Sequence, residues 1–225
     1  MHLLLLAAAS PWTACALNVV LLRHGETEWN RQGRLQGSSD SPLTARGIEQ
    51  ASACGKRLRN RKFAAAYCSP MLRAKRTATL VLDELEAAPE LSVEPALRER
   101  SFGVWEGLQW STIEAEHADS LRRAQSEPDY AIPGGGESRQ ETLERALGFL
   151  SSLPERHAAS DGSVLLVTHS GTATSLIREV LGLRPDGPRR FEVRNLALNE
   201  LRFDREKGVW LLRTLGDVAH LEGVD

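Results

Sequence analysis

The chain has 225 residues, of which 41% are hydrophobic and 26% are charged, and its 28 basic and 30 acidic side chains give a net charge of −2. These values are typical of a globular protein and exclude a disordered chain. Because a nearly neutral chain lacks a field strong enough to hold a nucleic-acid backbone or an anionic membrane surface, we expect neither partner.

The first 16 residues, MHLLLLAAASPWTACA, form an apolar segment that allows two interpretations. A short apolar run followed by Ala14-Cys15-Ala16 resembles a secretory leader with a small-residue cleavage site. No Lys or Arg precedes the apolar run, which instead favours an uncleaved extension. The protein is cytoplasmic if the segment is retained, and secretory or organellar if it is cleaved. The sequence leaves both interpretations open.

Short apolar runs alternate with a segment of helical periodicity in the first third of the chain. Asn18 to Leu22 and Phe63 to Cys68 are runs typical of buried strands. Between them, Thr44 to Asn60 has the spacing of an amphipathic helix, with Thr44 as its N-cap.

The start of another helix follows the second run. Ser69 is the expected N-cap and Pro70 the first helical residue, which places Arg73 in the first turn. A third strand is expected at 91–94.

The second half of the chain continues this alternation. Capping boxes at Ser111 and Glu114, and at Ser138 and Glu141, predict helices that extend to residues 124 and 154. A strand at 163–167 and a helix ending before Gly182 follow. The carboxyl-terminal part predicts edge strands joined by a turn, at 191–194, 196–203 and 209–213.

This order of elements predicts an α/β fold. We expect a three-layer sandwich in which helices cover both faces of a mostly parallel sheet. The chain contains no internal repeat or linker, so the prediction is a single domain at 17–225, present as a monomer or a homodimer.

Polar residues follow three of the predicted strands: Arg23-His24, the turn from Ser69 to Arg73, and His169. Ligands of open α/β sheets bind outside the carboxyl ends of the strands. Two guanidinium groups at one small site indicate a dianion such as a phosphate. The helices that start after Ser69 and Ser170 are expected to add backbone N–H groups to the same site.

Histidine surrounded by cations is pushed towards the neutral form, which is a nucleophile. Attack of His24 on phosphorus would give a phosphohistidine and divide hydrolysis into two displacements. This scheme needs an acid that protonates the leaving oxygen, and Glu99, in the loop LRERSFG, is the best-placed carboxyl group.

These motifs together resemble the histidine phosphatase superfamily, whose members have the phosphoglycerate mutase-like fold. The similarity is carried, in family order, by LLRHGETEWN, RLQGSSDSPLTARG, CSPMLRAKRTA, LRERSFGVWEG, PGGGES and LLVTHSGT. By position, it implies that His24 is phosphorylated and that Glu99 is the proton donor and later the base. It implies that the remaining phosphate pocket contains Arg23, Asn30, Gln36, Gly37, Arg73, His169 and Ser170. It implies neither a metal nor a cofactor.

Departures from the mutase pattern favour the phosphatase branch. Mutases of this superfamily usually carry a lysine where this chain has Gln109-Trp110, and a longer insertion in the same region. Phosphatases specific for phosphoserine tend to have a histidine at the position of Phe102. We therefore expect a metal-independent phosphomonoesterase acting on small phosphorylated metabolites. The alternatives are a bisphosphoglycerate-dependent phosphoglycerate mutase and a non-catalytic module that binds a phosphorylated ligand.

The segment 102–136 is expected to recognise the leaving group. Arg100, Arg122 and Arg123 either contact a second anionic group or form a solvated charged face, and the solvated face is the expectation. Trp105 and Trp110 either line the mouth of the pocket or pack internally, and the sequence favours neither interpretation.

Overall fold

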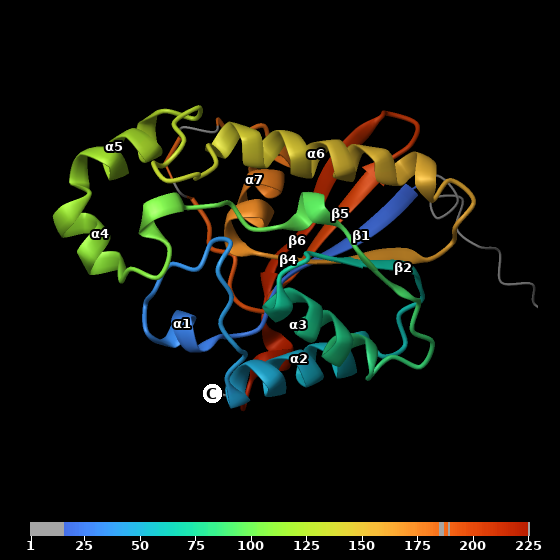
Figure 1. Ribbon diagram of the computed structural model, residues 1–225. Helices are drawn as coiled ribbons and strands as arrows, with labels where there is room; N and C mark the ends of the chain where they lie inside the picture. Colours follow the sequence, from blue (N-terminus) through green and yellow to red (C-terminus); the bar gives the residue numbers. More distant parts are fainter. Residues whose placement is uncertain (1–15, 185–186, 189, 225) are drawn as a thin grey trace, which may run out of the picture.

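A six-stranded sheet forms the centre of the computed structural model, which describes residues 16–184, 187–188 and 190–224 (Figure 1). The strand order is β3-β2-β4-β1-β5-β6. The first four strands in this order run parallel, whereas β5 is antiparallel to both β1 and β6. The strands are β1 (Ala16–Arg23), β2 (Phe63–Cys68), β3 (Leu91–Val93), β4 (Ser163–Thr168), β5 (Leu198–Asp204) and β6 (Val209–Asp217).

Helices cover both faces of this sheet, with α2 and α3 on one face and α6 and α7 on the other (Figure 1). The two shorter helices α4 and α5 belong to an excursion between β3 and α6. The helices are α1 (Glu28–Arg31), α2 (Ala45–Leu58), α3 (Leu72–Leu82), α4 (Trp110–Glu116), α5 (Ala118–Ser126), α6 (Arg139–Arg156) and α7 (Ser170–Val180), with 3₁₀ turns η1 (Pro95–Leu97), η2 (Gly103–Trp105) and η3 (Ala219–Leu221).

The alternation of side chains along the central strands divides the core into two layers. Val20 and Leu22 of β1 pack with α2 and α3, whereas Val19 and Leu21 pack with α6 and α7. Successive residues of a strand point to opposite faces, so a strand covered on both sides must be apolar throughout. This explains why β4 is buried along its whole length.

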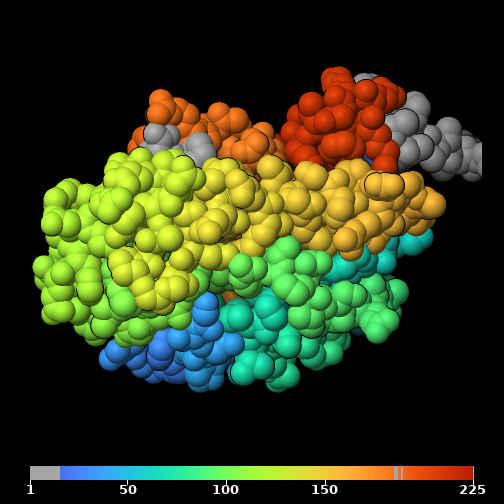
Figure 2. Space-filling model, turned by 45° about the horizontal axis from the view of Figure 1, so that its top comes forward, coloured from blue at the N-terminus to red at the C-terminus, as the bar shows by residue number. Residues whose placement is uncertain are grey.

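A smaller third cluster lies under the excursion, where Trp105 packs with Ile113, Ala124 and Ile132. Figure 2 shows the yellow-green surface of α4 and α5 at one end of the molecule, beside the yellow surface of α6. The excursion therefore has a core of its own, separate from the two layers on the sheet.

The predicted α/β fold, with a mostly parallel sheet, is confirmed, and β2 has the predicted bounds. The Thr44 N-cap and the Ser138–Glu141 capping box are also present. Two predictions about the carboxyl-terminal strands are wrong. Residues 191–194 form no strand, and β5 is not an edge strand, because it lies between β1 and β6.

The helix predicted from Ser111 towards residue 124 is divided in two. His117, with φ −123° and ψ 28°, leaves the helical conformation between α4 and α5. The capping box at Ser111 and Glu114 is also wrong, since α4 begins at Trp110 and Gln109 is its N-cap.

The expected leader or extension falls on residues 1–15, outside the described part, and on Ala16. Ala16 is the first residue of β1 and pairs with Asp204 of β5. Among the described helices, none combines the length and the apolar character needed to cross a membrane.

Candidate active site

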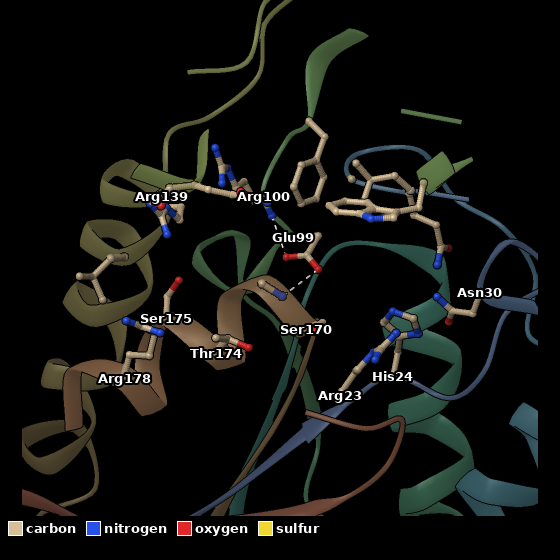
Figure 3. Close-up of a pocket in the computed structure, with 18 of the residues that line it drawn as sticks. Arg23, His24, Asn30, Glu99, Arg100, Arg139, Ser170, Thr174, Ser175 and Arg178 are labelled. Atoms are coloured by element: carbon tan, nitrogen blue, oxygen red, sulfur yellow. Dashed lines mark hydrogen bonds between the residues drawn. The ribbon is translucent and has the colours of Figure 1, made fainter. Parts of the chain in front are cut away.

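A cavity of about 860 Å³ opens at the carboxyl ends of β1 and β4 and extends under the excursion (Figure 3). We call its two parts the strand half and the distal half. The strand half is lined by Arg23, His24, Asn30, Gln36, Gly37, Arg73, Glu99 and Ser170. The distal half is lined by Arg100, Phe102, Trp110, Gln125, Arg139, Leu143, Thr174, Ser175, Arg178, Glu179, Leu183, Gly187 and Pro188.

His24 lies directly after β1 and is only 3% exposed. Its Nδ1 is 2.7 Å from the carbonyl oxygen of Gly25. Since a carbonyl can only accept, Nδ1 carries the proton and Nε2 keeps its lone pair. Burial, followed by the charges of Arg23 and Arg73, lowers the pKa of His24 well below its ordinary value of 6.5. The imidazole is therefore held in the neutral, nucleophilic form.

The backbone of His24 is fixed on both sides. Its N–H donates to the carbonyl of Thr168 in β4 over 2.9 Å, and its carbonyl accepts from Nδ2 of Asn195 over 2.7 Å. No local pattern in the sequence indicates a role for Asn195, because this residue lies 171 positions from His24.

Arg73 lies in the first turn of α3, as predicted, and is 2% exposed. Its Nη1 donates to the carbonyl of Ser39 and to Oδ1 of Asp40, and its Nη2 donates to the carbonyl of Gly37, over 2.6 to 2.8 Å. The loop 37–40 therefore fixes the guanidinium at the wall of the cavity.

The predicted start of α3 is wrong. The helix begins at Leu72 with Met71 as N-cap, and Asp40 accepts the backbone N–H groups of Leu72 and Arg73. Ser69 does not cap the helix. Its Oγ accepts from the N–H of Met71 and lies 2.7 Å from Nε2 of His169.

Glu99 lies near the centre of the cavity, at the end of the strand half that adjoins the distal half (Figure 3). Its carboxylate accepts from the backbone N–H groups of Arg100, Gly171 and Thr172 over 2.9 to 3.2 Å. Two of these donors, Gly171 and Thr172, belong to the first turn of α7. The expectation that α3 and α7 offer N–H groups to a ligand is wrong for these groups, because Asp40 accepts from the start of α3 and Glu99 from Gly171 and Thr172. For Ser170, which lines the cavity, it stays a prediction.

His169 is fully buried and stands behind His24 rather than in the wall of the cavity. The two ring centroids are 5.2 Å apart in an edge-on contact. Burial, followed by the charge of Arg73, lowers the pKa of His169 well below 6.5. Its Nδ1 has no hydrogen-bond partner among the described residues. Direct contact of His169 with a phosphate stays a prediction.

The remaining predicted residues all line the strand half. Asn30 accepts the N–H of Thr27 through Oδ1 and so also closes the capping box of α1. Gln36 is 6% exposed, and its Oε1 is buried without a partner in the described structure. Arg23 donates to the carbonyl of Val193.

Glu106 belongs to the quoted motif FGVWEG, but the sequence indicated no role for it. Its carboxylate accepts from Ser38 and Ser39 of one loop, and from Ser101 and Phe102 of another. Backbone N–H bonds from Ser38 and Phe102 outweigh burial and lower the pKa of Glu106. Glu106 joins the loop that holds Arg73 to the loop that follows Glu99.

The open question about the two tryptophans has a different answer for each. Trp105 is 2% exposed and packs in the cluster under the excursion, whereas Trp110 lines the distal half. In the described ranges, no three His, Cys, Asp or Glu side chains gather in a group that could hold a metal ion. The absence of a metal requirement stays a prediction.

The chain matches the model of the histidine phosphatase superfamily (branch 1) over residues 19–217 and belongs to this superfamily. The matched range includes every residue that lines the cavity. The protein is thus an enzyme of phosphatase or mutase-like type.

Among its relatives, the probable phosphoglycerate mutase GpmB of Salmonella choleraesuis is 35% identical over 210 residues, which cover 92% of this chain and 95% of the relative. Bacillus stearothermophilus YhfR is similar in structure, with a TM-score of 0.79 and 30% identity over 91% of this chain and 99% of the other. A mycobacterial glucosyl-3-phosphoglycerate phosphatase, solved with VO3, has a TM-score of 0.79 and 27% identity over 89% and 99% of the two chains. Proteins named as mutases and proteins named as phosphatases are thus both similar to this chain.

Proposed function

We propose that the protein is a phosphomonoesterase that needs no metal and hydrolyses small phosphorylated metabolites through a phosphohistidine on His24. The observation that carries this proposal is the state of His24. Its Nδ1–H is held by the carbonyl of Gly25, and its pKa is lowered, so a neutral Nε2 is available at the cavity.

In the first step, Nε2 of His24 attacks phosphorus and the ester P–O bond breaks. The guanidinium groups of Arg23 and Arg73 stabilise the charge on the three non-bridging oxygens. Glu99 gives its proton to the leaving oxygen, so that the product is a neutral alcohol. The position of Glu99 in the centre of the cavity supports this role.

In the second step, Glu99 takes a proton from a water molecule, and the water oxygen attacks the phosphohistidine. The P–N bond breaks, inorganic phosphate leaves, and His24 regains its lone pair. The edge-on contact with His169 and the bond from Asn195 support a fixed orientation of His24 in both steps.

Hydrolysis of p-nitrophenyl phosphate in EDTA tests the proposal, with wild type and His24→Ala measured in parallel. We expect the substitution to lower kcat by at least about three orders of magnitude, since the nucleophile is lost. Equal rates in the two proteins would contradict the proposal. The absence of turnover in both would favour a module that only binds a phosphorylated ligand.

The name of the Salmonella relative favours a second candidate, a phosphoglycerate mutase primed by a bisphosphate. Incubation with 3-phosphoglycerate and 2,3-bisphosphoglycerate separates the two functions. Release of phosphate without formation of 2-phosphoglycerate is the expected result. Isomerisation faster than phosphate release would show that the protein is a mutase and not a phosphatase.

A further inference from the structure

The motif PGGGES has no role in the proposed reaction, yet one of its residues contacts the loop that carries Glu99. We call residues 96–101 the Glu99 loop. The backbone N–H of Glu137 donates to the carbonyl of Ser101 over 2.9 Å, and the carbonyl of Glu137 accepts from Nε of Arg100 over 2.8 Å. The motif is thus bound to the part of the loop that directly follows Glu99.

The carboxylate of Glu137 binds the loop on both sides of Glu99. It accepts from the guanidinium of Arg98 and from the backbone N–H of Ser101, the latter over 3.3 Å. Burial raises the pKa of Glu137, but the hydrogen bonds and charge of Arg145 and the charge of Arg98 outweigh burial and lower the pKa below its ordinary value. Glu137 is therefore a charged hydrogen-bond acceptor beside the loop.

Arg145, in the second turn of α6, joins Glu137 to the start of the same loop. Its Nε and Nη2 donate to the two carboxylate oxygens of Glu137 over 2.9 and 2.8 Å, and its Nη1 donates to the carbonyls of Ala96 and Arg98 over 2.7 and 2.8 Å. The side chains of Arg145 and Glu137 are only 13% and 14% exposed. A bidentate pair has a defined geometry, so this ion pair fixes the position of the loop as well as its charge environment.

The neighbouring elements hold the rest of the loop. Oγ1 of Thr168 donates to the carbonyl of Leu97, and Oγ1 of Thr172 donates to the carbonyl of Arg98, each over 2.6 Å. The backbone N–H of Thr172 also donates to the carboxylate of Glu99. The Glu99 loop is therefore fixed to α7 by Thr172 and to α6 by Arg145.

The Glu137–Arg145 pair lies outside the cavity wall. Neither residue is among the described residues that line the cavity, whereas Glu99 and Arg100 of the loop both line it. An effect of the pair on the reaction therefore has to pass through the side chains that it holds. Of these, Glu99 is the one to which the proposed reaction assigns a proton transfer.

The contact with Glu137 also separates Arg100 from the two arginines that the sequence grouped with it. Arg100 is 7% exposed, so the solvated face expected for it is wrong. Arg122 pairs with Asp119, and Arg123 pairs with Glu127, on the exposed side of α5. The expected solvated face is thus present at Arg122 and Arg123.

We propose that Glu137 and Arg145 are a positioning pair for Glu99, which holds the carboxyl group where it can protonate the leaving oxygen. This inference rests on the proposed phosphatase reaction, in which Glu99 is the proton donor. A proton moves between hydrogen-bonded atoms, so a displacement of about 1 Å is enough to slow this step about a hundredfold. The attack of His24 on phosphorus uses other contacts, and a substrate that needs no acid is affected less.

Two substrates that differ in their need for an acid test the pair. Glycerol 3-phosphate needs a proton on its leaving oxygen, whereas p-nitrophenolate leaves without one. The measured quantity is kcat/KM for glycerol 3-phosphate divided by kcat/KM for p-nitrophenyl phosphate. Because both substrates are measured on one sample, this ratio does not depend on the fraction of protein that is folded.

We expect Arg145→Gln to lower the ratio about 10- to 100-fold, because Glu99 is displaced. Arg145→Lys keeps the charge but cannot replace the bidentate contact, so it also lowers the ratio. Arg61→Gln is the matched control. Arg61 forms a partly buried ion pair with Glu200 and does not line the cavity, so we expect this variant to keep the ratio of wild type.

The same substitution in a Glu99→Gln background shows whether the pair acts through Glu99. If it does, Arg145→Gln changes the ratio no further once the acid is absent, because the two substitutions remove the same contribution. A second decrease of similar size would show that the pair acts on another part of the site, and would overturn the proposal.

The remaining outcomes separate the pair from the proposed function. If Glu99→Gln lowers the ratio but neither Arg145→Gln nor Arg145→Lys does, the phosphatase reaction stands and the positioning pair is wrong. If Glu99→Gln keeps the ratio of wild type, Glu99 is not the proton donor, and the inference fails with that role. If wild type hydrolyses neither substrate, the proposed function fails, and the inference with it.

Discussion

The strand half and the distal half of the cavity are built in different ways. In the strand half, each reactive side chain is fixed by the backbone around the ends of the strands. Gly25 holds the ring of His24, the loop 37–40 holds Arg73, and two N–H groups in the first turn of α7 hold Glu99.

In the distal half, the cations come from a loop and two helices that meet only in the folded molecule. Arg100 is held by carbonyls of the excursion, and Arg178 by carbonyls of the segment after α7. We propose that the two halves have different roles. The strand half would act on phosphorus, whereas the distal half, formed by the excursion and the end of α7, would select the phosphomonoester.

Among the substitutions that test the difference between the two halves, Glu99→Gln is expected to have the largest effect. The glutamine amide cannot protonate the leaving oxygen, so kcat/KM for glycerol 3-phosphate falls about 10²- to 10⁴-fold. The loss of kcat/KM is much smaller for p-nitrophenyl phosphate, because p-nitrophenolate leaves without a proton. Steady-state measurements of kcat/KM with both substrates give the difference, since kcat/KM does not include the second step, in which Glu99 acts as the base.

Glu116→Gln, an exposed substitution on α4, serves as the control for Glu99→Gln and keeps wild-type rates with both substrates. Equal losses for the two substrates in Glu99→Gln would show that Glu99 positions neighbouring groups and is not the proton donor.

A smaller effect is expected at the loop that holds Arg73. Gly37 has φ +55°, and a Cβ there would lie 2.2 Å from Oε1 of Glu106. Gly37→Ala therefore displaces Glu106 and the carbonyl that accepts from Arg73. We expect kcat/KM for p-nitrophenyl phosphate to fall about tenfold or more, since small displacements of a catalytic group are costly.

Gly33→Ala provides a matched control for Gly37→Ala. Gly33 has φ +66°, but no atom lies within 4 Å of a Cβ at this position. Both variants lose about 1 to 2 kcal/mol of unfolding free energy through the left-handed backbone, as measured by urea denaturation. Only Gly37→Ala should lose activity. An equal loss of activity in both would assign the effect to backbone strain.

The smallest effect concerns the neutral histidines of the strand half. The pKa values of His24 and His169 are below 6.5 in the folded protein, so below pH 6.5 the unfolded chain binds protons that the folded chain does not. The free energy of unfolding therefore decreases as the pH falls through this range, by at most about 1.4 kcal/mol per pH unit for each group.

Urea denaturation between pH 5 and 7 measures this slope, in wild type and in His169→Gln. We expect a shallower slope in the variant, because one of the two groups no longer titrates in the unfolded chain. The same slope in both proteins would contradict the account of His169 as a buried neutral group.

Much of the strand half could be predicted from the sequence, because its residues lie next to strands or in short motifs. His24 follows β1 directly, and Arg73 falls in the first turn of α3 even though the expected N-cap was wrong. Asp40, which caps α3, lies 32 residues before Leu72, and no local pattern indicates such a pairing.

The distal half could not be predicted in the same way. Arg139 and Arg178 are ordinary helical residues in the sequence, and only the packing of α6 beside α7 brings them to one cavity. The break at His117 could not be predicted either, since no Gly or Pro between Ser111 and Ala124 marks it in the sequence. Local patterns predict local structure, whereas the lining of the distal half depends on contacts between distant segments.

The central claim is that His24 carries the phosphoryl group during turnover. Wild-type protein is mixed with p-nitrophenyl phosphate, quenched in alkali, in which phosphohistidine is stable, and digested for mass spectrometry. We expect one phosphoryl group on His24, which is labile to acid, forms at least as fast as the enzyme turns over, and is absent from His24→Ala. Turnover without a phosphoryl group on His24, or with one on a different residue, would contradict it.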